Sequence, residues 1–420
     1  MTQREIFPCL HDRCLLACLL LASCARGIAQ PPPTGQSGQS VSQILDASLA
    51  HGADIGAKVN ALVKGCAGAS CRIMIPAGSY RYSTPIVLAT NVELYGAGAK
   101  LTILEFRGAP DTTSITVGNS TINVKLHDFK VEGTKEVVGN GSSYNKTFGI
   151  SVSGSNNLID KVQVAHFWGY GGGITIRGSH NTVTNSDVQY ATFCINLGGD
   201  HLIIKNNYVS NHYSTASSSE RPAVHYWDGI AAEGLNDSRI EGNTVEDNAQ
   251  SGIYQGGNGS LSQRNEIIGN IVRRNWNRGL DNGVTGDVSP VNGISFLTVT
   301  NNHVVDNLED NIWLICVQHA TVTGNYSEYT SDYPKFFGTH TANTRSGIAV
   351  GDLCGKGAQS NVDYVTVSGN TVIDYQKTAM IGLNFNVRVT SIGNKFTGNS
   401  NNAGFYVAPS VELKKNVVQK

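Results

Sequence analysis

The tetrapeptide Gly-Asn-Thr-Val occurs at residues 242–245 and again at 369–372, and looser copies recur through the second half of the chain. Each copy places an asparagine between two short runs in which apolar and polar residues alternate. The asparagines are Asn185, Asn207, Asn243, Asn270, Asn302, Asn325, Asn370 and Asn394. Neighbouring members are 22, 36, 27, 32, 23, 45 and 24 residues apart. A unit in the low twenties without helical periodicity predicts a stack of β-coils, with the asparagine at a corner and the longer steps carrying insertions.

A second landmark fixes the register of this repeat. An apolar residue preceded by a small or polar one stands about 11 to 13 residues before the next asparagine; examples are Ile174, Ile195, Ile230, Ile312 and Ile381. Each coil therefore contains at least two strands, one on either side of the asparagine. Stacked asparagines can hydrogen-bond to one another along the axis, so the repeat predicts a parallel β-helix with an asparagine ladder.

The composition agrees with short strands and many turns. Only 15 % of the residues are Asp, Glu, Lys or Arg, and the 420-residue chain has 47 glycines, whereas an average soluble domain has about 25 % charged residues. The formal net charge is −1. A nearly neutral chain gives no basis for a nucleic-acid groove or for attraction to an anionic membrane surface.

The N-terminal segment has the features of an export signal. A short apolar run at 14–23 follows Arg4 and Arg13, as in signal peptides. The sequence 21–24 resembles a lipoprotein box that would leave Cys24 lipidated, while 27–29 offers a small-x-small cleavage site, and both alternatives stay open. We expect a signal over 1–29, a Pro/Gly/Ser/Gln tether over 30–40, one domain over 41–410 and a tail over 411–420. The mature protein is then periplasmic, an outer-membrane lipoprotein or extracellular in a bacterium, and is expected to be a monomer.

We make a prediction for four of the cysteines that follow the N-terminal segment. Cys66 and Cys71 lie close enough in the sequence to close a small disulfide loop in an oxidising compartment, or they remain two thiols. Cys194 and Cys316 fall in strand-like runs and are expected to be small core residues. No Cys/His spacing resembles that of a zinc site.

Two segments near the N-terminus carry a family resemblance. The sequences at 53–66 and 73–104, "ADIGAKVNALVKGC" and "IMIPAGSYRYSTPIVLATNVELYGAGAKLTIL", resemble the first segment of the pectate-lyase-like right-handed β-helix superfamily. The resemblance covers about 41–408 and implies an all-β, single-domain right-handed parallel β-helix with a short N-terminal capping helix. Helical spacing at 40–52 and 58–66 places such helices over the open end of the first coil. Members of the superfamily act on polysaccharides by uronate elimination, glycoside hydrolysis or C5 epimerisation.

Insertions in the longer repeats mark where a site can form. They cover 210–227, 282–293, 327–347 and 351–361. Loops of this length within a regular solenoid are usually functional, and adjacent ones can wall a groove.

The strand that follows the second landmark supplies the first candidate site. If Ile253, Leu280 and Ile312 point inward, the next residues, Tyr254, Asp281 and Trp313, point outward on coils about 4.8 Å apart. Aromatic faces stack on sugars and a carboxylate does acid–base work, so Asp281 and the outward-facing Glu233 are candidate catalytic residues, and Tyr254 and Trp313 candidate substrate contacts. Asp281 also fits an ordinary turn residue.

The end of the first insertion supplies a second set. His225 and Asp228 are candidate proton-transfer residues, since a histidine near neutrality can abstract a uronate C5 proton. Arg221 is a candidate for stabilising the substrate carboxylate. Arg278, next to the ladder, pairs with Asp281, binds a substrate carboxylate or does neither.

The reaction class stays open at the level of sequence. The chain lacks the Asp-Asp pair and Gly-His-Gly of polygalacturonases, the Asp-Pro-His of alginate epimerases and the Trp-Ile-Asp-His of typical pectate lyases. We therefore expect an exported polysaccharide-active enzyme that cleaves glycosidic bonds as a hydrolase or a uronate lyase; the alternative is a non-catalytic glycan-binding or structural solenoid. No cofactor is expected, with Ca²⁺ only in a lyase, where Asp306, Glu309 and Asp310 are possible ligands that also fit turn residues.

Overall fold

The computed structural model describes residues 41–44, 53–134, 147–167, 172–213, 228–256, 261–283, 293–315, 317–338, 346–351, 364–374, 381–385, 389–398, 405–407, 412–414 and 417–419. The fold below is that of the compact unit 39–420. The predicted export signal, Cys24 and the tether lie outside the described residues.

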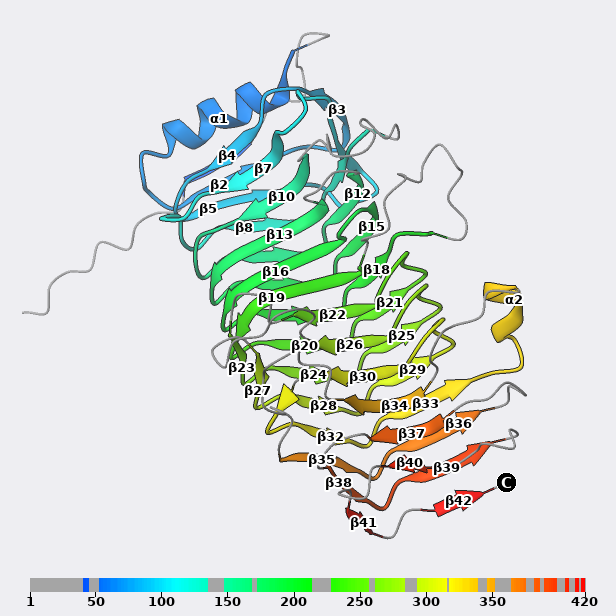
Figure 1. Cartoon of the computed structure of the whole chain (residues 1–420). Helices are drawn as coiled ribbons and strands as arrows, with labels where there is room; N and C mark the ends of the chain where they lie inside the picture. Colours follow the sequence, from blue (N-terminus) through cyan, green and yellow to red (C-terminus); the bar gives the residue numbers. More distant parts are fainter. Residues whose placement is uncertain are drawn as a thin grey trace, which may run out of the picture. The chain divides into compact units, whose positions relative to one another are not determined.

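Three parallel sheets run along this unit, and nearly every coil gives one strand to each of them (Figure 1). Sheet A consists of β1 (Val41–Ile44), β2 (Cys71–Met74), β5 (Val92–Tyr95), β8 (Lys125–His127), β11 (Leu158–Asp160), β14 (Thr182–Thr184), β17 (Ile203–Lys205), β20 (Arg239–Glu241), β24 (Glu266–Ile268), β28 (Thr298–Thr300), β32 (Thr321–Thr323), β35 (Val365–Ser368), β38 (Val389–Ile392) and β41 (Glu412–Lys414). Sheet B consists of β3 (Gly78–Tyr82), β6 (Thr102–Phe106), β9 (Lys130–Glu132), β12 (Gln163–Phe167), β15 (Asp187–Ala191), β18 (Tyr208–Ser210), β21 (Thr244–Glu246), β25 (Ile271–Arg273), β29 (His303–Val305), β33 (Tyr326–Tyr329), β36 (Thr371–Asp374), β39 (Lys395–Gly398) and β42 (Val417–Gln419). Sheet C consists of β4 (Ile86–Leu88), β7 (Thr113–Val117), β10 (Phe148–Val152), β13 (Gly172–Ser179), β16 (Ile195–Asp200), β19 (Ile230–Asn236), β22 (Ile253–Gly256), β26 (Leu280–Gly283), β30 (Ile312–Ile315), β34 (Ser346–Gly351), β37 (Ile381–Phe385) and β40 (Phe405–Val407), with β23 (Ser262–Gln263), β27 (Ile294–Ser295) and β31 (Val317–Gln318) as a short branch.

The chain passes through the sheets in the order A, B, C and then repeats. The predicted parallel β-helix is therefore confirmed, with three strands in a coil where the sequence required at least two. Strands β41 and β42 extend sheets A and B into 411–420, so this segment adds to the solenoid instead of forming a separate tail.

The repeated asparagine lies at the corner between sheets A and B. The Nδ2 group of Asn243 donates to Oδ1 of Asn270 on the next coil at 3.0 Å, and the backbone amide of Asn243 donates to the same oxygen at 2.9 Å. The same bonds run without interruption from Asn207 to Asn394. Burial of these amides away from water requires such partners, so the ladder fixes the register of the coils.

One predicted ladder member is wrong. Asn185 is at the surface, where it donates to Asp160 at 2.8 Å, and Ser186 takes the ladder position by donating its amide to Asn207. The residue before each ladder position has a positive φ, 50° for Asn185 and 63° for Gly242. Glycine and asparagine tolerate this conformation, which explains why the repeat reads Gly-Asn or Asn-Asn.

A second buried ladder, not predicted, lies at the corner between sheets B and C. The side chains of Asn248, Asn275 and Asn307 bond in sequence along the axis, and the ladder ends on Asn311. Its members stand before Ile253, Leu280 and Ile312, so this ladder fixes the start of β22, β26 and β30.

The N-terminal end of the coil stack is closed by α1 (Ile55–Gly65), which buries Ile55, Val59 and Val63. The helical prediction for 41–44 is wrong, because these residues form β1 and pair with β2; residues 45–52 lie outside the described ones. Extended residues complete the first coil by continuing the hydrogen-bond ladder of sheet A, which a helix could not do.

The predictions for the cysteines among the described residues are confirmed. Cys66 and Cys71 form a disulfide with an S–S distance of 2.03 Å. Cys194 is fully buried, and burial raises the pKa of its thiol to about 12. Cys316 lies outside the described residues.

Candidate functional site

Three side chains of adjacent coils form the predicted row on sheet C. Tyr254 of β22 pairs with Asp281 of β26, and Asp281 pairs with Trp313 of β30. Alanines end the row at Ala231 and Ala349. Parallel in-register pairing of this kind brings the three side chains to one face as neighbours.

Sheet C is also the sheet whose ends receive the insertions. Two connections from sheet B carry 214–227 and 338–345, and connections leaving sheet C carry 257–260, 284–292 and 352–363. Most of these residues lie outside the described ones, so the walled groove stays a prediction. The start of one insertion is described: α2 (Tyr333–Phe337) packs Tyr333 and Phe337 against Trp276 and Leu308.

A second column of residues lies beside the row. Each member stands two positions before the inward-pointing apolar residue that begins a sheet C strand. Asp228, Ser251, Arg278 and Asp310 occupy this place on successive coils, as shown by the amides of Gly229, Gly252 and Gly279, which donate to the carbonyls of Ser251, Arg278 and Asp310. The column could have been found by aligning the sequences Asp-Gly-Ile, Ser-Gly-Ile, Arg-Gly-Leu and Asp-Asn-Ile. Sequence reasoning identified Asp228 and Arg278 but missed Ser251 and the role of Asp310.

Ser251 connects the two columns. Its amide donates to Oδ1 of Asp228 at 2.9 Å, and its hydroxyl donates to Oδ2 of Asp281 at 2.8 Å. Both aspartates are buried, with 5 % and 4 % of their surface exposed. Two carboxyl groups bound by one serine lie within about 9 Å of each other.

The two aspartates have different surroundings. Burial raises the pKa of Asp228 to about 8 in spite of the Ser251 amide, and the charges of Asp281 and Glu233 add to the increase. Burial also raises the pKa of Asp281, but Arg278 at 3.4 Å and the Ser251 hydroxyl oppose that increase by favouring the ionised carboxylate. Asp281 thus has a cation beside it that favours the ionised form, whereas the charges that act on Asp228 are negative and favour its protonated form.

Arg278 is held by several acidic partners. Its guanidinium forms ion pairs with Asp281, with Glu309 at 3.2 Å and with Asp310 at 3.7 Å. It also lies over the ring of Trp313, 3.6 Å from the ring centre. Arg278 covers this face of the ring, and a sugar contact of Trp313 stays a prediction. The pairing of Arg278 with Asp281 is the alternative that is realised.

Tyr254 and Glu233 lie on the open side of the cluster. Tyr254 is half-buried, and burial together with the charges of Asp281, Glu233 and Asp228 raises the pKa of its phenol, so it remains a neutral donor. Its hydroxyl lies over Gly256, where any larger residue would collide with it. Glu233 pairs with Gly256 in register and is exposed.

Two predicted residues cannot be placed, because His225 and Arg221 lie outside the described residues. The proposed Ca²⁺ ligands do not act together in the structure. Asp306 instead accepts hydrogen bonds from the amide of Thr330 at 2.7 Å and from its hydroxyl at 2.6 Å, which is the role of a loop cap. Glu309 and Asp310 both face Arg278.

The three parallel sheets define this protein as a parallel β-helix, and one face of it contains a buried carboxyl pair. Comparison with known proteins gives its family. Residues 111–327 match the family model described as the right-handed β-helix region, so the chain belongs to that family. The fold expected from the pectate-lyase-like resemblance is confirmed. Neither α1 nor α2, the helices among the described residues, has the length and apolar character of a membrane span.

Phage proteins are among the relatives. The tail spike protein of Salmonella phage epsilon15 is 35 % identical over 206 residues, which cover 45 % of this chain and 19 % of the phage protein. The chain thus spans about a fifth of that relative. The structure is similar to Dettilon tailspike protein (gp208), with 21 % identity, a TM-score of 0.68, and coverage of 85 % of this chain and 66 % of that one.

An enzyme module has a similar structure as well. The Azotobacter vinelandii mannuronan C-5 epimerase AlgE6 A-module is 14 % identical with a TM-score of 0.58, covering 88 % of this chain and 96 % of the module. At identities of 21 % and 14 %, these two structural similarities establish the shared fold.

Proposed function

We propose that this protein is an exported, polysaccharide-active β-helix enzyme that hydrolyses glycosidic bonds on the outer face of sheet C. The observation that carries the proposal is the pair Asp228 and Asp281, two buried carboxyl groups held by Ser251 in different electrostatic surroundings. Glycoside hydrolysis needs one protonated and one ionised carboxyl group, separated by about 5–9.5 Å.

In this proposal Asp228 is the general acid. A pKa of about 8 keeps its carboxyl group protonated at neutral pH, so it can donate to the oxygen of the leaving sugar. Asp281 is the carboxylate that attacks the anomeric carbon or activates water. Its Oδ1 atom is buried and has no hydrogen-bond partner among the described residues.

The surroundings of the pair fit a sugar substrate. Tyr254 presents a neutral phenol beside the aspartates, and Glu233 adds an exposed carboxylate two coils from Asp281. The similarity to a module named for its action on mannuronan supports a polysaccharide substrate without choosing one. Export is consistent with the N-terminal sequence, with the disulfide and with the phage tail spike relatives.

Elimination has less support from the described residues. A uronate lyase needs a base and a cation that neutralises the substrate carboxylate. Arg278 is already bound to three acidic side chains, and Trp313 covers its guanidinium. His225 and Arg221, the remaining candidates for these roles, lie outside the described residues.

The test is a screen of plant, algal and bacterial polysaccharides with the purified protein, with and without Ca²⁺. New reducing ends and absorbance of unsaturated uronates are measured together. Reducing ends without absorbance, lost in Asp228→Asn and in Asp281→Asn but kept in Asp128→Asn, support hydrolysis. Absorbance together with reducing ends shows a lyase. Saturable binding of a glycan without either product shows a non-catalytic glycan-binding solenoid.

A further inference from the structure

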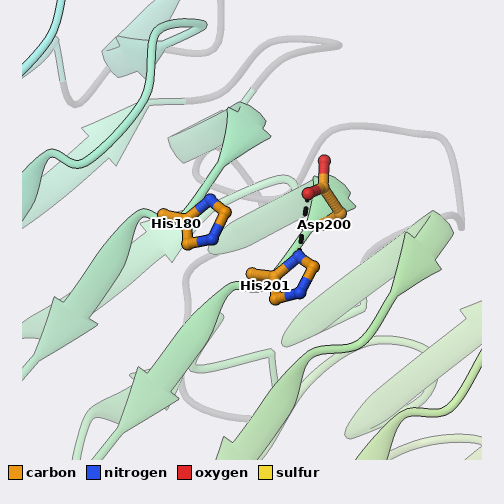
Figure 2. A group of neighbouring side chains, drawn as sticks. All are labelled: His180, Asp200 and His201. Atoms are coloured by element: carbon orange, nitrogen blue, oxygen red, sulfur yellow. Dashed lines mark hydrogen bonds and ion pairs between the residues drawn. The ribbon is translucent and has the colours of Figure 1, made fainter. Parts of the chain in front are cut away.

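Two histidines stack at the corner between sheets C and A, away from the aspartate pair. His180 follows β13 and His201 follows β16 on the next coil, and both have positive φ values, 56° and 54°. Their rings are nearly parallel, with centres 4.5 Å apart (Figure 2). The corner conformation therefore places two imidazole groups on one exposed edge.

Asp200 adds a carboxylate to this pair. Its Oδ2 atom lies 2.9 Å from Nδ1 of His201, as Figure 2 shows. One ligand atom from each of His180, Asp200 and His201 lies within 4.8 Å of the other two. A tetrahedral Zn²⁺ ion with bonds of about 2.0–2.1 Å needs its ligand atoms about 3.3 Å apart. The side chains of Asp200 and His201 are about half exposed, so rotation about their side-chain bonds can close the difference.

The same corner contains a stack that serves as a comparison. Phe296, His319 and Tyr364 also stand just before strands of sheet A, with ring centres 4.7 and 4.8 Å apart. Ring stacking is thus a general packing device of this corner. The pair His180 and His201 differs because both rings carry nitrogen ligands and because Asp200 supplies an oxygen ligand beside them.

A further carboxylate on the next coil is already occupied. Asp237 is bound through both oxygens by Arg264, each at 2.6 Å. It is near enough to His201 for their charges to interact, but it is not counted among the ligands. The ligand set is therefore two nitrogens and one oxygen.

We propose that His180, Asp200 and His201 bind one divalent transition-metal ion, with Zn²⁺ as the reference ion. Imidazole with a carboxylate suits Zn²⁺, Co²⁺, Ni²⁺ and Cu²⁺, whereas Ca²⁺ and Mg²⁺ prefer oxygen ligands alone. The ion joins two adjacent coils, and water fills its remaining positions because the three side chains face solvent. Sequence spacing did not show the site, since the two histidines stand one coil apart and not in a local motif.

The experiment uses the full chain with any affinity tag removed and metal stripped by EDTA. Zn²⁺ binding is measured by calorimetry, and Co²⁺ is used as a coloured probe of nitrogen and oxygen ligation. The variants are His180→Ala, His201→Ala, Asp200→Asn and, as a matched control, His319→Ala, which removes a stacked histidine from the same corner. Circular dichroism verifies that each variant is folded.

We expect one Zn²⁺ per chain, with affinity at least about tenfold weaker in His180→Ala and in His201→Ala, and a smaller loss in Asp200→Asn. His319→Ala should bind as the unchanged protein does. Equal binding in the unchanged protein and in the two histidine variants would overturn the proposal, as would a Kd at or above about 1 mM in the unchanged protein. A loss in His319→Ala equal to that in His180→Ala would also overturn it, because binding would then not depend on the proposed ligands.

Discussion

The hydroxyl group of Ser251 lies 2.8 Å from Oδ2 of Asp281 on the neighbouring coil. This bond favours the charged form of the carboxylate, because a donor to an ionised oxygen stabilises the ion. The amide of the same serine holds Asp228. One small residue at a corner therefore determines how two carboxyl groups of different coils face each other.

Ser251→Ala should lower the turnover rate by roughly tenfold through loss of this positioning bond. It should also raise the pKa of Asp281, so the acidic limb of the pH–rate profile moves to higher pH while the alkaline limb stays. The measurement is kcat against pH on the substrate found by the screen. Ser251→Thr keeps a hydroxyl group and should restore the position of the limb; a purely structural serine would leave the limb unmoved in both variants.

Activity should decline as pH rises through about 8. The pKa of Asp228 is raised to about 8, so its carboxyl group holds the donated proton below that pH and loses it above. Asp228→Asn should reduce kcat by about 10²- to 10⁴-fold, the usual contribution of a general acid. The pH profile of the unchanged protein and the rate of the variant give the test.

The same chemical change outside the site serves as the control for this prediction. Asp128→Asn alters a surface aspartate that binds His127, and it should leave kcat and the alkaline limb unchanged. If Asp228→Asn retains activity while remaining folded, Asp228 is not the acid.

Gly256→Ala should disturb the site without removing any polar group. A methyl group at this position collides with the hydroxyl of Tyr254 and forces its side chain to move. If Tyr254 binds the sugar, KM rises while the free energy of unfolding changes little. Tyr254→Phe keeps the ring in place and removes only the hydroxyl, so a larger KM in Gly256→Ala than in Tyr254→Phe indicates contact through the ring. Equal KM values in Gly256→Ala and the unchanged protein would contradict a substrate contact.

Much of this site follows from the repeat in the sequence. Once the landmark residues are taken as inward, alternation along a strand and a coil spacing of about 4.8 Å place Tyr254, Asp281 and Trp313 in one row. Their pairing in the structure has that register. The row could be predicted because a strand fixes the side of each residue by its position alone.

The neighbouring column could not be read in the same way. Asp228, Ser251 and Arg278 stand at a corner, where no simple alternation gives the direction of a side chain, although their positions before the landmark align. The stacking of Arg278 on Trp313 depends on the rotamer of a long side chain, chosen by acidic partners on other coils. Alternation along the strand therefore predicted the position of Trp313 but not its contact with Arg278.

Asn270→Ala should destabilise the solenoid by about 2–4 kcal/mol. The change removes donors to Ile240 and Asn302 and leaves the amide groups of Asn243 without their acceptor in a buried corner. Buried polar groups without a partner carry the full cost of desolvation. Equilibrium urea unfolding measures the loss. Asn185→Gly is the control: Asn185 lies at the surface outside the ladder and glycine tolerates its positive φ, so a change below about 0.5 kcal/mol is expected, and equal losses would contradict the ladder assignment.

Asp54 should give the N-terminal cap an acid-sensitive stability. Its carboxylate accepts bonds from the amides of Ala57, Ser83 and Thr84, which lower its pKa from 3.8 to about 2 against the opposing effect of burial. A lowered folded-state pKa means that the stabilisation is complete above about 4 and is lost as pH falls toward 2. Asp54→Ala should cost about 1–2 kcal/mol at pH 7, the value of a helix cap. Asp54→Asn keeps an acceptor without the charge. The difference in the free energy of unfolding between this variant and the unchanged protein, measured with urea, should therefore shrink as the pH falls from 5 to 2. A difference that stays constant over this range would show that the charge of Asp54 does not stabilise the cap.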